Sequence, residues 1–262
     1  MSLVSSLVVW LTAAAGVAAI PAAPPLRVCA DPNNMPFSNA HDDGFENRIA
    51  ALVARDLARP LTYVWAPQRR GFIRGTLDAG RCDVVVGVPA GFGRLQTTRP
   101  YYRSSYVFVS RRDRHLRVAS FDDPRLKALT IGIQVTGDDY NNPPAAQALA
   151  SRGLVDRVRG YPVYGDYSRP DPQRGLVDDV ARGRLDLAVV WGPQGGYYAG
   201  RQRVRLDITP VRERHPAAPF DFAIAMGVRR GDEALSRALD QALVRHAVEI
   251  RRILSAYGVP LS

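Results

Sequence analysis

Three polar side chains at the end of the first apolar run are candidates for ligand binding. Asp31, Asn33 and Asn34 follow the run Leu26 to Ala30, and a helix is expected to begin at Gly44. A strand, a polar break and a helix form the opening half of a βαβ unit, whose ligand crevice lies beyond the carboxyl end of the strand. The same residue types also dominate simple turns, so this segment alone supports a turn as well as a binding loop.

Further candidates lie near the ends of other apolar runs. The run Asp83 to Val88 is continuous, which is typical of a parallel strand buried on both faces, and Arg94 lies in its exit loop. Parallel strands of one sheet end at the same edge, so their exit loops meet at one crevice. Aromatic side chains gather at these exits. A large ring with one polar atom suits a small-molecule pocket as well as a protein interface.

The residues predicted to line this shared cleft are acidic, amide, basic and aromatic. They are Asp31, Asn33, Asn34, Phe37, Arg69, Arg70, Arg94, Tyr101, Tyr102, Asp138, Asp139, Tyr140, Tyr164, Tyr167, Trp191, Tyr197 and Tyr198. Taken singly, each aromatic residue is better explained by core or hinge packing. Their concentration at strand exits is what favours a cleft.

Sequence motifs of the common enzyme classes are absent. The chain has no nucleophile elbow, P-loop, HExxH motif or Rossmann glycine fingerprint. The histidines are far apart in the sequence, at His41, His115, His215 and His246. We therefore expect no catalytic residues, no metal site and no cofactor, and we expect that the protein is not an enzyme.

The chain is strongly basic, and its positive charge comes almost entirely from arginine. The formal net charge is +10, and Lys127 is the only lysine. Such a field favours acidic partners. The arginines are scattered, however, and neither zinc-ligand spacing nor an RNA-binding aromatic signature is present. We therefore do not expect nucleic acid as a partner.

The N-terminal segment predicts export. Residues 3–20 form an apolar run followed by small residues and prolines, which is typical of a secretory signal peptide. We assign residues 1–23 to this peptide and expect a periplasmic protein with no membrane span after cleavage. No Lys or Arg precedes the apolar run, so a retained membrane anchor stays open as the alternative.

An oxidising compartment lets the two cysteines, Cys29 and Cys82, form a disulfide. Cys29 lies late in its strand, whereas Cys82 comes just before the next buried run. Parallel neighbours in simple register would hold these residues too far apart for a bond. The sequence leaves a disulfide and two buried thiols equally open.

The elements that must position these residues fall into two βαβ-rich halves. Extended segments at Tyr101 to Arg111 and at Phe220 to Val228 are expected to cross between the halves, and a long helix is expected over Asp232 to Tyr257. We predict an α/β bilobal fold with two hinge strands. Lobe 1 would comprise residues 24–110 and 220–262, and lobe 2 residues 111–219. One continuous doubly wound sheet is the competing architecture.

Several segments carry a resemblance to a known family. They read RVCADPNNMPFSN, CDVVVGVP, TTRPYYRSSYVF, IGIQVTGDDYNNPPAAQAL, LDLAVVWGPQGGYYA and DFAIAMGVR. Their order resembles the type II periplasmic solute-binding proteins of ABC transporters and, more narrowly, the MxaJ/XoxJ group of proteins associated with quinoprotein dehydrogenases. The similarity spans about residues 26–260.

The resemblance implies a bilobal type II fold and a periplasmic accessory role. The protein would bind a PQQ-dependent methanol or alcohol dehydrogenase, or its cytochrome c, and assist its activation or assembly. The alternative is a transporter receptor that holds a small amino-acid-like, neutral or cationic solute in the cleft.

Two features depart from the amino-acid binders of this superfamily. Those proteins hold the ligand carboxylate at a helix N-terminus of the second lobe, where free backbone donors attract anions. Asp138 and Asp139 occupy that position here and would repel an anion. Arg94 also stands at a different spacing from Tyr101 than the carboxylate-binding arginine of those proteins. An amino-acid ligand is therefore less favoured.

Overall fold

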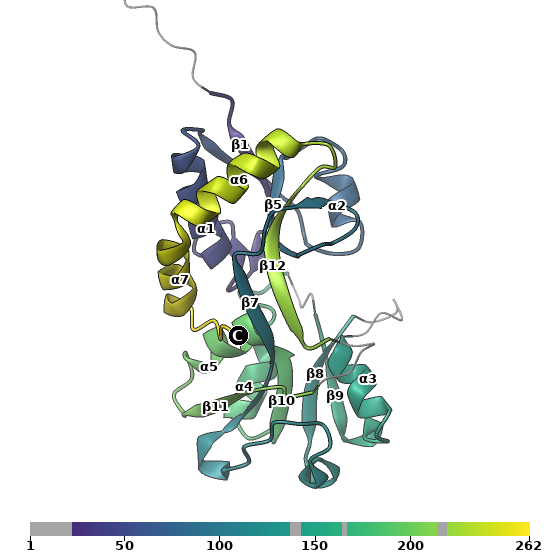
Figure 1. The fold of residues 1–262 in the computed structure, drawn as a ribbon. Helices are drawn as coiled ribbons and strands as arrows, with labels where there is room; N and C mark the ends of the chain where they lie inside the picture. The colour runs from purple at the N-terminus through teal and green to yellow at the C-terminus, as the bar shows by residue number, and fades with distance from the viewer. Residues whose placement is uncertain (1–22, 137–142, 164–166, 214–218) are drawn as a thin grey trace, which may run out of the picture.

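Two α/β lobes make up the described chain, one above the other in Figure 1. The computed structural model describes residues 23–136, 143–163, 167–213 and 219–262. All but the last residue of the predicted signal peptide lies outside the described residues. Four predicted cleft residues lie outside them too, namely Asp138, Asp139, Tyr140 and Tyr164.

Three parallel strands organise the first lobe. In sheet order they are β4 (Leu61–Trp65), β1 (Leu26–Ala30) and β5 (Val84–Pro89). Helix α1 (Phe45–Asp56) buries Ile49 and Val53 against one face, because its apolar residues recur at helical spacing. The short helix α2 (Phe72–Gly75) covers the opposite face.

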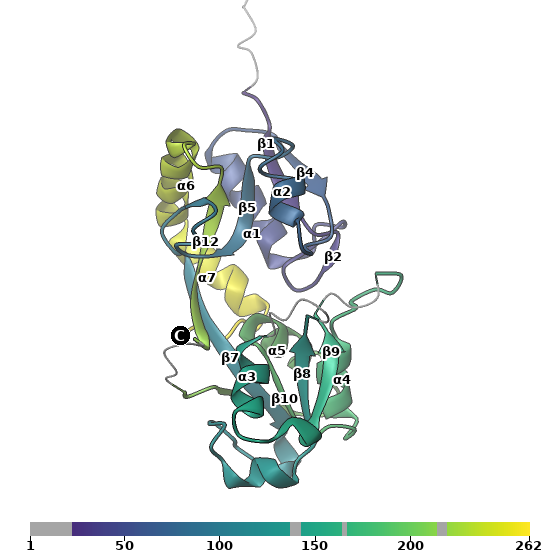
Figure 2. The same cartoon turned by 90° about the vertical axis from the view of Figure 1, so that its right-hand side faces the viewer.

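The second lobe repeats this strand order. Its parallel strands are β9 (Val158–Pro162), β8 (Ile131–Val135) and β10 (Leu187–Trp191). The helices of this lobe are α3 (Pro144–Ala150), α4 (Gly175–Ala181) and α5 (Gly192–Ala199). Short 3-10 helices occur at Arg112–Arg114, Pro124–Ala128 and Val155–Arg157. Figure 2 shows that the carboxyl ends of the parallel strands face the other lobe in both lobes.

Two long antiparallel strands connect the lobes. The first half of β7 (Tyr102–Arg111) pairs with β12 (Asp221–Val228), and its second half pairs with β10 and with β11 (Leu206–Pro210). Strand β12 also pairs with β5 and with the short β6 (Gln96–Thr97). Both crossings follow the predicted segments. The hydrogen-bonded strand order runs through them from one lobe to the other, and the chain forms two lobes rather than a single doubly wound domain. The lobe boundaries assigned from the sequence stay a prediction.

The C-terminal helix is divided in two, in contrast to the single helix predicted over Asp232 to Tyr257. Helix α6 (Glu233–Arg245) ends at His246, and α7 (Ala247–Ala256) begins directly after it. Asp56 of α1 accepts hydrogen bonds from Arg245 Nε at 3.1 Å and pairs with His246 Nε2 at 2.9 Å. These contacts fix the break against α1.

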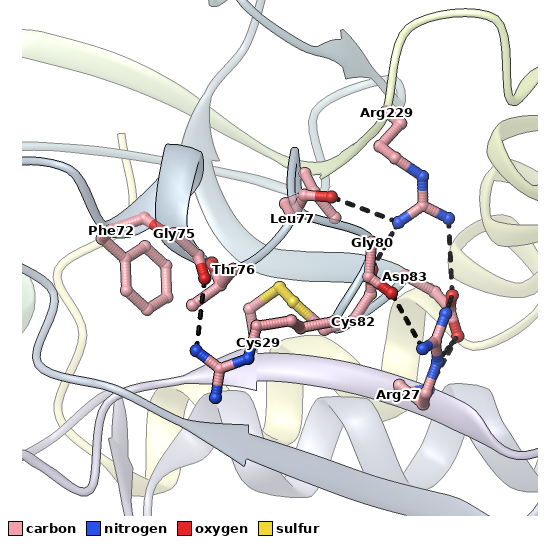
Figure 3. Close-up of a disulfide and its surroundings, with 11 residues drawn as sticks. Arg27, Cys29, Phe72, Gly75, Thr76, Leu77, Gly80, Cys82, Asp83 and Arg229 are labelled. Carbon is pink, nitrogen blue, oxygen red and sulfur yellow. Dashed lines mark hydrogen bonds and ion pairs between the residues drawn. A yellow bond between two sulfur atoms is a disulfide. The ribbon is translucent and has the colours of Figure 1, made fainter.

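The structure joins Cys29 and Cys82 in a disulfide, with 5.5 Å between their Cα atoms. Strand register places Val84 beside Val28, so a straight β5 would put Cys82 about three residues, or about 10 Å, from Cys29. The chain instead turns over the face of β1 before Asp83. Figure 3 shows the disulfide beside Phe72 and Leu77, with which it packs. The geometric objection from the sequence assumed a straight approach, and that assumption is wrong.

Among the residues that the structure describes, no helix combines the length and the apolar character that crossing a bilayer requires.

Candidate functional site

A cleft of about 590 Å³ lies between the lobes at the carboxyl ends of their parallel strands. Figure 2 shows β2 (Asn33–Asn34) of the first lobe facing the ends of β8 and β9. The apolar part of the lining comes largely from aromatic rings, namely Phe37, Tyr106, Tyr167, Trp191 and Phe222. The polar part comes from Asp31, Asn34, Gln68, Gln134, Gln173 and Gln194.

Asp31 is the centre of a hydrogen-bond network rather than a free ligand group. Its carboxylate accepts hydrogen bonds from the backbone N–H of Asn33 at 2.8 Å and of Gln68 at 2.6 Å. It also accepts one from the hydroxyl of Tyr167 in the second lobe. The side chain is only 2% exposed. Asp31 therefore shapes the binding loop, as Asx turns do, and ties the two lobes together.

A chain of amide side chains extends this connection across the cleft. Gln173 Nε2 of the second lobe donates to Asn34 Oδ1 at 2.7 Å, and Asn34 Nδ2 donates to Gln68 Oε1 at 3.1 Å. Gln194 donates in turn to Gln173, and Asn33 Nδ2 donates to the carbonyl of Arg169 at 2.9 Å. The lobes are therefore in direct contact on this side of the cleft, as in a closed hinged protein.

Three aromatic rings from the connecting strands form a wall of the cleft. Trp191 of β10 lies 5.5 Å from Tyr106 of β7 and 5.7 Å from Phe222 of β12, measured between ring centroids. Each strand belongs to a different segment of the chain, so the wall exists only in the assembled fold. Such a surface binds apolar and aromatic groups by burial and edge-to-face contacts.

The described lining of the cleft offers no cation to an anionic ligand. Among its described lining residues there is no Arg or Lys. Arg94 is instead paired with Asp78 at 2.5 Å, which corrects the expectation that it lines the cleft. A ligand carboxylate would thus lose its hydration without gaining an opposite charge. No group of three or more His, Cys, Asp or Glu suited to a metal ion occurs in the described part of the chain.

Glu46, in the first turn of α1, lies beneath the cleft in an adjoining hollow of about 180 Å³. Burial, and secondarily the charge of Asp31, raises the pKa of the Glu46 carboxyl to about 8. Gly87 of β5 leaves room for it, since a Cβ atom there would lie 2.0 Å from Oε1. The hollow beside the cleft therefore contains a carboxyl group that is mostly protonated at neutral pH.

Glu46 predicts a pH dependence of stability. The folded-state pKa of about 8 exceeds the ordinary value of 4.5, so folding is penalised as pH rises between these values. We expect Glu46→Gln to stabilise the protein at pH 8 by a few kcal/mol, since each pKa unit is worth about 1.4 kcal/mol. Near pH 4 the melting temperatures of Glu46→Gln and the unmodified protein should agree. The exposed Glu233→Gln is the control, and an unchanged melting temperature for Glu46→Gln at pH 8 would contradict the prediction.

The structure brings five predicted residues to the cleft and places others beside it or in the core. Those that line it are Asp31, Asn34, Phe37, Tyr167 and Trp191. Asn33 lies at the contact between lobes, whereas Arg69, Arg70 and Arg94 line a separate groove.

Three tyrosines expected in the cleft do not line it, which corrects those expectations. Tyr101 donates to the carbonyl of Val86 at 3.0 Å. A fourth, Tyr102, is mostly buried and lines only the hollow that adjoins the cleft. Tyr198 donates to the carbonyl of Met35 at 3.0 Å, and the Tyr197 ring stacks on Tyr257. The tyrosines of α5 point into the core because that helix packs against β7 and the C-terminal segment.

The sequence interpretation missed several lining residues. Gln194 lies in α5 directly after the buried strand β10, and Gln134 lies near the carboxyl end of β8, so the strand-exit argument could have found both. Tyr106 lies in the middle of β7 and Phe222 is the second residue of β12, and alternation along a strand does not show which face meets the cleft. Gln173 carries no local signal, since it lies in an irregular segment.

Comparisons with known proteins support this architecture. No protein-family model matches the chain. Over 259 residues it is 35% identical to Protein MoxJ of Methylorubrum extorquens, covering 95% of this chain and 86% of that protein.

Two solved structures have the same fold. The crystal structure of MxaJ from Methlophaga aminisulfidivorans has a TM-score of 0.78 and 27% identity, covering 90% of this chain and all of that one (100%). The crystal structure of periplasmic binding protein XoxJ from Methylobacterium extorquens has a TM-score of 0.74 and 36% identity, and the match covers 90% of this chain and 99% of that one. The predicted bilobal type II fold is thereby confirmed.

Proposed function

Since the chain belongs to the family of MoxJ, MxaJ and XoxJ, we propose that it is a periplasmic accessory protein of a PQQ-dependent methanol or alcohol dehydrogenase. It binds the dehydrogenase or its cytochrome c and assists activation or assembly, and it catalyses no reaction itself. The proposal starts from the family, and the aromatic and amide lining of the cleft supports it.

The observation that carries the proposal is the aromatic lining of the cleft, whose described residues include no Arg or Lys. The wall of Trp191, Tyr106 and Phe222 would bury apolar side chains of a partner segment. The amides around it can satisfy backbone N–H and C=O groups of an entering peptide, which must find partners when buried. Aromatic residues of this kind commonly dominate the affinity of protein interfaces.

The test is recovery of the partner from periplasmic extract. The tagged chain without residues 1–23 is used as bait at low and moderate salt, and bound proteins are identified by mass spectrometry. A quinoprotein dehydrogenase or its cytochrome should be recovered. Trp191→Ala should reduce recovery at least tenfold, because such central aromatic residues are worth about 2 kcal/mol or more.

A matched control separates binding from folding. Trp65→Ala removes an equally large, partly buried ring that does not line the cleft. It should leave recovery unchanged, and thermal unfolding should show that both variants are folded. Equal recovery with Trp191→Ala and the unmodified chain would contradict the role of the cleft.

A transporter receptor for a small solute is the second candidate. Its support is the size of the cleft, about 590 Å³, which lies within the range of small-molecule sites. Failure to recover a dehydrogenase or cytochrome, together with thermal stabilisation by a neutral or cationic solute, would establish this alternative.

A further inference from the structure

A second groove, of about 450 Å³, lies on the first lobe beside the cleft. One wall is the segment Gln68 to Arg74, which leads into and forms most of α2. The other wall is the end of β5 and the loop that follows it, up to Arg94. All of its described lining residues belong to the first lobe.

The groove is strongly cationic. Its described lining contains four arginines, Arg69, Arg70, Arg74 and Arg94, and no acidic residue. Asp78, which neighbours the groove, pairs with Arg94. Arg69 also lies over the ring of Tyr167, at 4.7 Å from the ring centroid. The guanidinium groups of Arg69 and Arg94 are thus held in defined positions, which lowers the cost of ordering them against a carboxylate.

The groove also carries an exposed aromatic side chain. Phe92 is 41% exposed, although Leu95 of the same loop is buried. The loop is fixed by backbone hydrogen bonds from Phe92 N to Pro89 O and from Leu95 N to Phe92 O, at 3.1 and 2.9 Å. Phe92 is therefore held outward by a defined turn. An apolar patch rimmed by charge is typical of a protein interaction site.

The groove adjoins the cleft between the lobes. Gln68 and Pro89 line both hollows, so the two hollows are direct neighbours. The cleft has no described cation, whereas the groove has four. This separation of charge suits a polypeptide whose apolar part and acidic part follow one another.

We propose that this groove, lined by Arg69, Arg70, Arg74, Arg94 and Phe92, binds an acidic segment of a partner protein that carries an aromatic residue. The carboxylates contact the arginines, and the aromatic residue packs on Phe92. This inference rests on one part of the proposed function, namely that a segment of a partner protein enters the adjoining cleft.

The test uses the mature chain and two fluorescein-labelled 12-residue probes. One probe contains Glu, Asp and two Phe residues, and the other has Lys in place of every acidic residue. Fluorescence anisotropy should show at least tenfold tighter binding of the acidic probe, weakening as salt screens the charges. Arg70→Glu/Arg74→Glu should reduce its affinity at least tenfold, and Phe92→Ala several-fold.

The control is Arg251→Glu/Arg252→Glu on α7, which changes the net charge by the same amount at two exposed arginines. An equal loss of affinity in this control would overturn the proposal, because the effect would then be one of total charge. Lack of preference for the acidic probe would overturn it too. Tighter binding of anionic phosphatidylglycerol vesicles through Arg70 and Arg74 would assign the groove to a lipid surface instead.

The two proposals fail in different ways. If the chain recovers no dehydrogenase or cytochrome but binds the acidic probe through Arg70 and Arg74, the proposed function fails and the groove assignment stands. If recovery succeeds and Arg70→Glu/Arg74→Glu leaves both recovery and probe binding unchanged, the groove assignment alone fails.

Discussion

Replacing Cys29 and Cys82 together by alanine should lower the free energy of unfolding by about 4 kcal/mol. The disulfide closes a loop between residues 53 positions apart, and in the chain-entropy model a loop of this length restricts the unfolded chain by about that amount. Both residues are buried with Phe72 and Leu77, so truncation to alanine also removes some packing. Unfolding in guanidinium, with and without reductant, measures the free energy of unfolding of the double variant and of the unmodified protein.

Tryptophan fluorescence can assign this loss to a lobe. Without residues 1–23, the chain has two tryptophans, Trp65 in β4 and Trp191 in β10. A Trp191→Phe background leaves Trp65 as the reporter of the first lobe, where the disulfide lies. The unfolding midpoint reported by Trp65 should fall both in the double variant and in reduced unmodified protein. A loss below about 1 kcal/mol in both would contradict the entropic estimate.

Asp31→Ala should destabilise the protein by about 3 kcal/mol or more. The substitution leaves the backbone N–H groups of Asn33 and Gln68 without their acceptor, and a hydrogen bond to a charged group is worth about 1.5 to 3 kcal/mol. It also removes the bond from Tyr167 between the lobes. Thermal unfolding measures the loss of stability, and solution X-ray scattering measures the opening of the lobes.

Tyr167→Phe separates these two effects. It keeps the ring under Arg69 and removes only the hydroxyl that donates to Asp31. We expect a destabilisation of about 1 to 2 kcal/mol and a larger radius of gyration, because closure loses one charge-assisted hydrogen bond. A double-mutant cycle with Asp31→Asn gives the coupling energy. A radius of gyration unchanged in both Asp31→Ala and Tyr167→Phe would contradict the role of this contact in closure.

Much of the architecture could be predicted from local patterns. The run Leu26 to Ala30 is a strand with the same bounds in the structure, and the crossings at Tyr101 to Arg111 and Phe220 to Val228 correspond to β7 and β12 within one residue. These segments are continuous or alternating apolar runs, whose burial depends mainly on their own side chains. The rule that ligands bind beyond strand carboxyl ends then placed Asp31 and Trp191 at the cleft.

Side-chain direction could not be predicted in the same way. Tyr197 and Tyr198 follow a buried strand just as Trp191 ends one, yet they face the core, because α5 packs against β7 and the C-terminal segment. A helical period shows that one face is buried but not which neighbour buries it. The arginine at position 94 is likewise drawn to Asp78, a partner 16 residues away.

The sequence by itself determined the two α/β lobes, the two crossings and the family, because these depend on apolar runs and segments read along the chain. The tertiary structure decided which side chains meet. The disulfide depends on a turn over the face of β1, the Asp31 network on a tyrosine 136 residues away, and the aromatic wall on three separate strands. Such contacts are set by the packing of distant segments, and no local pattern specifies that packing.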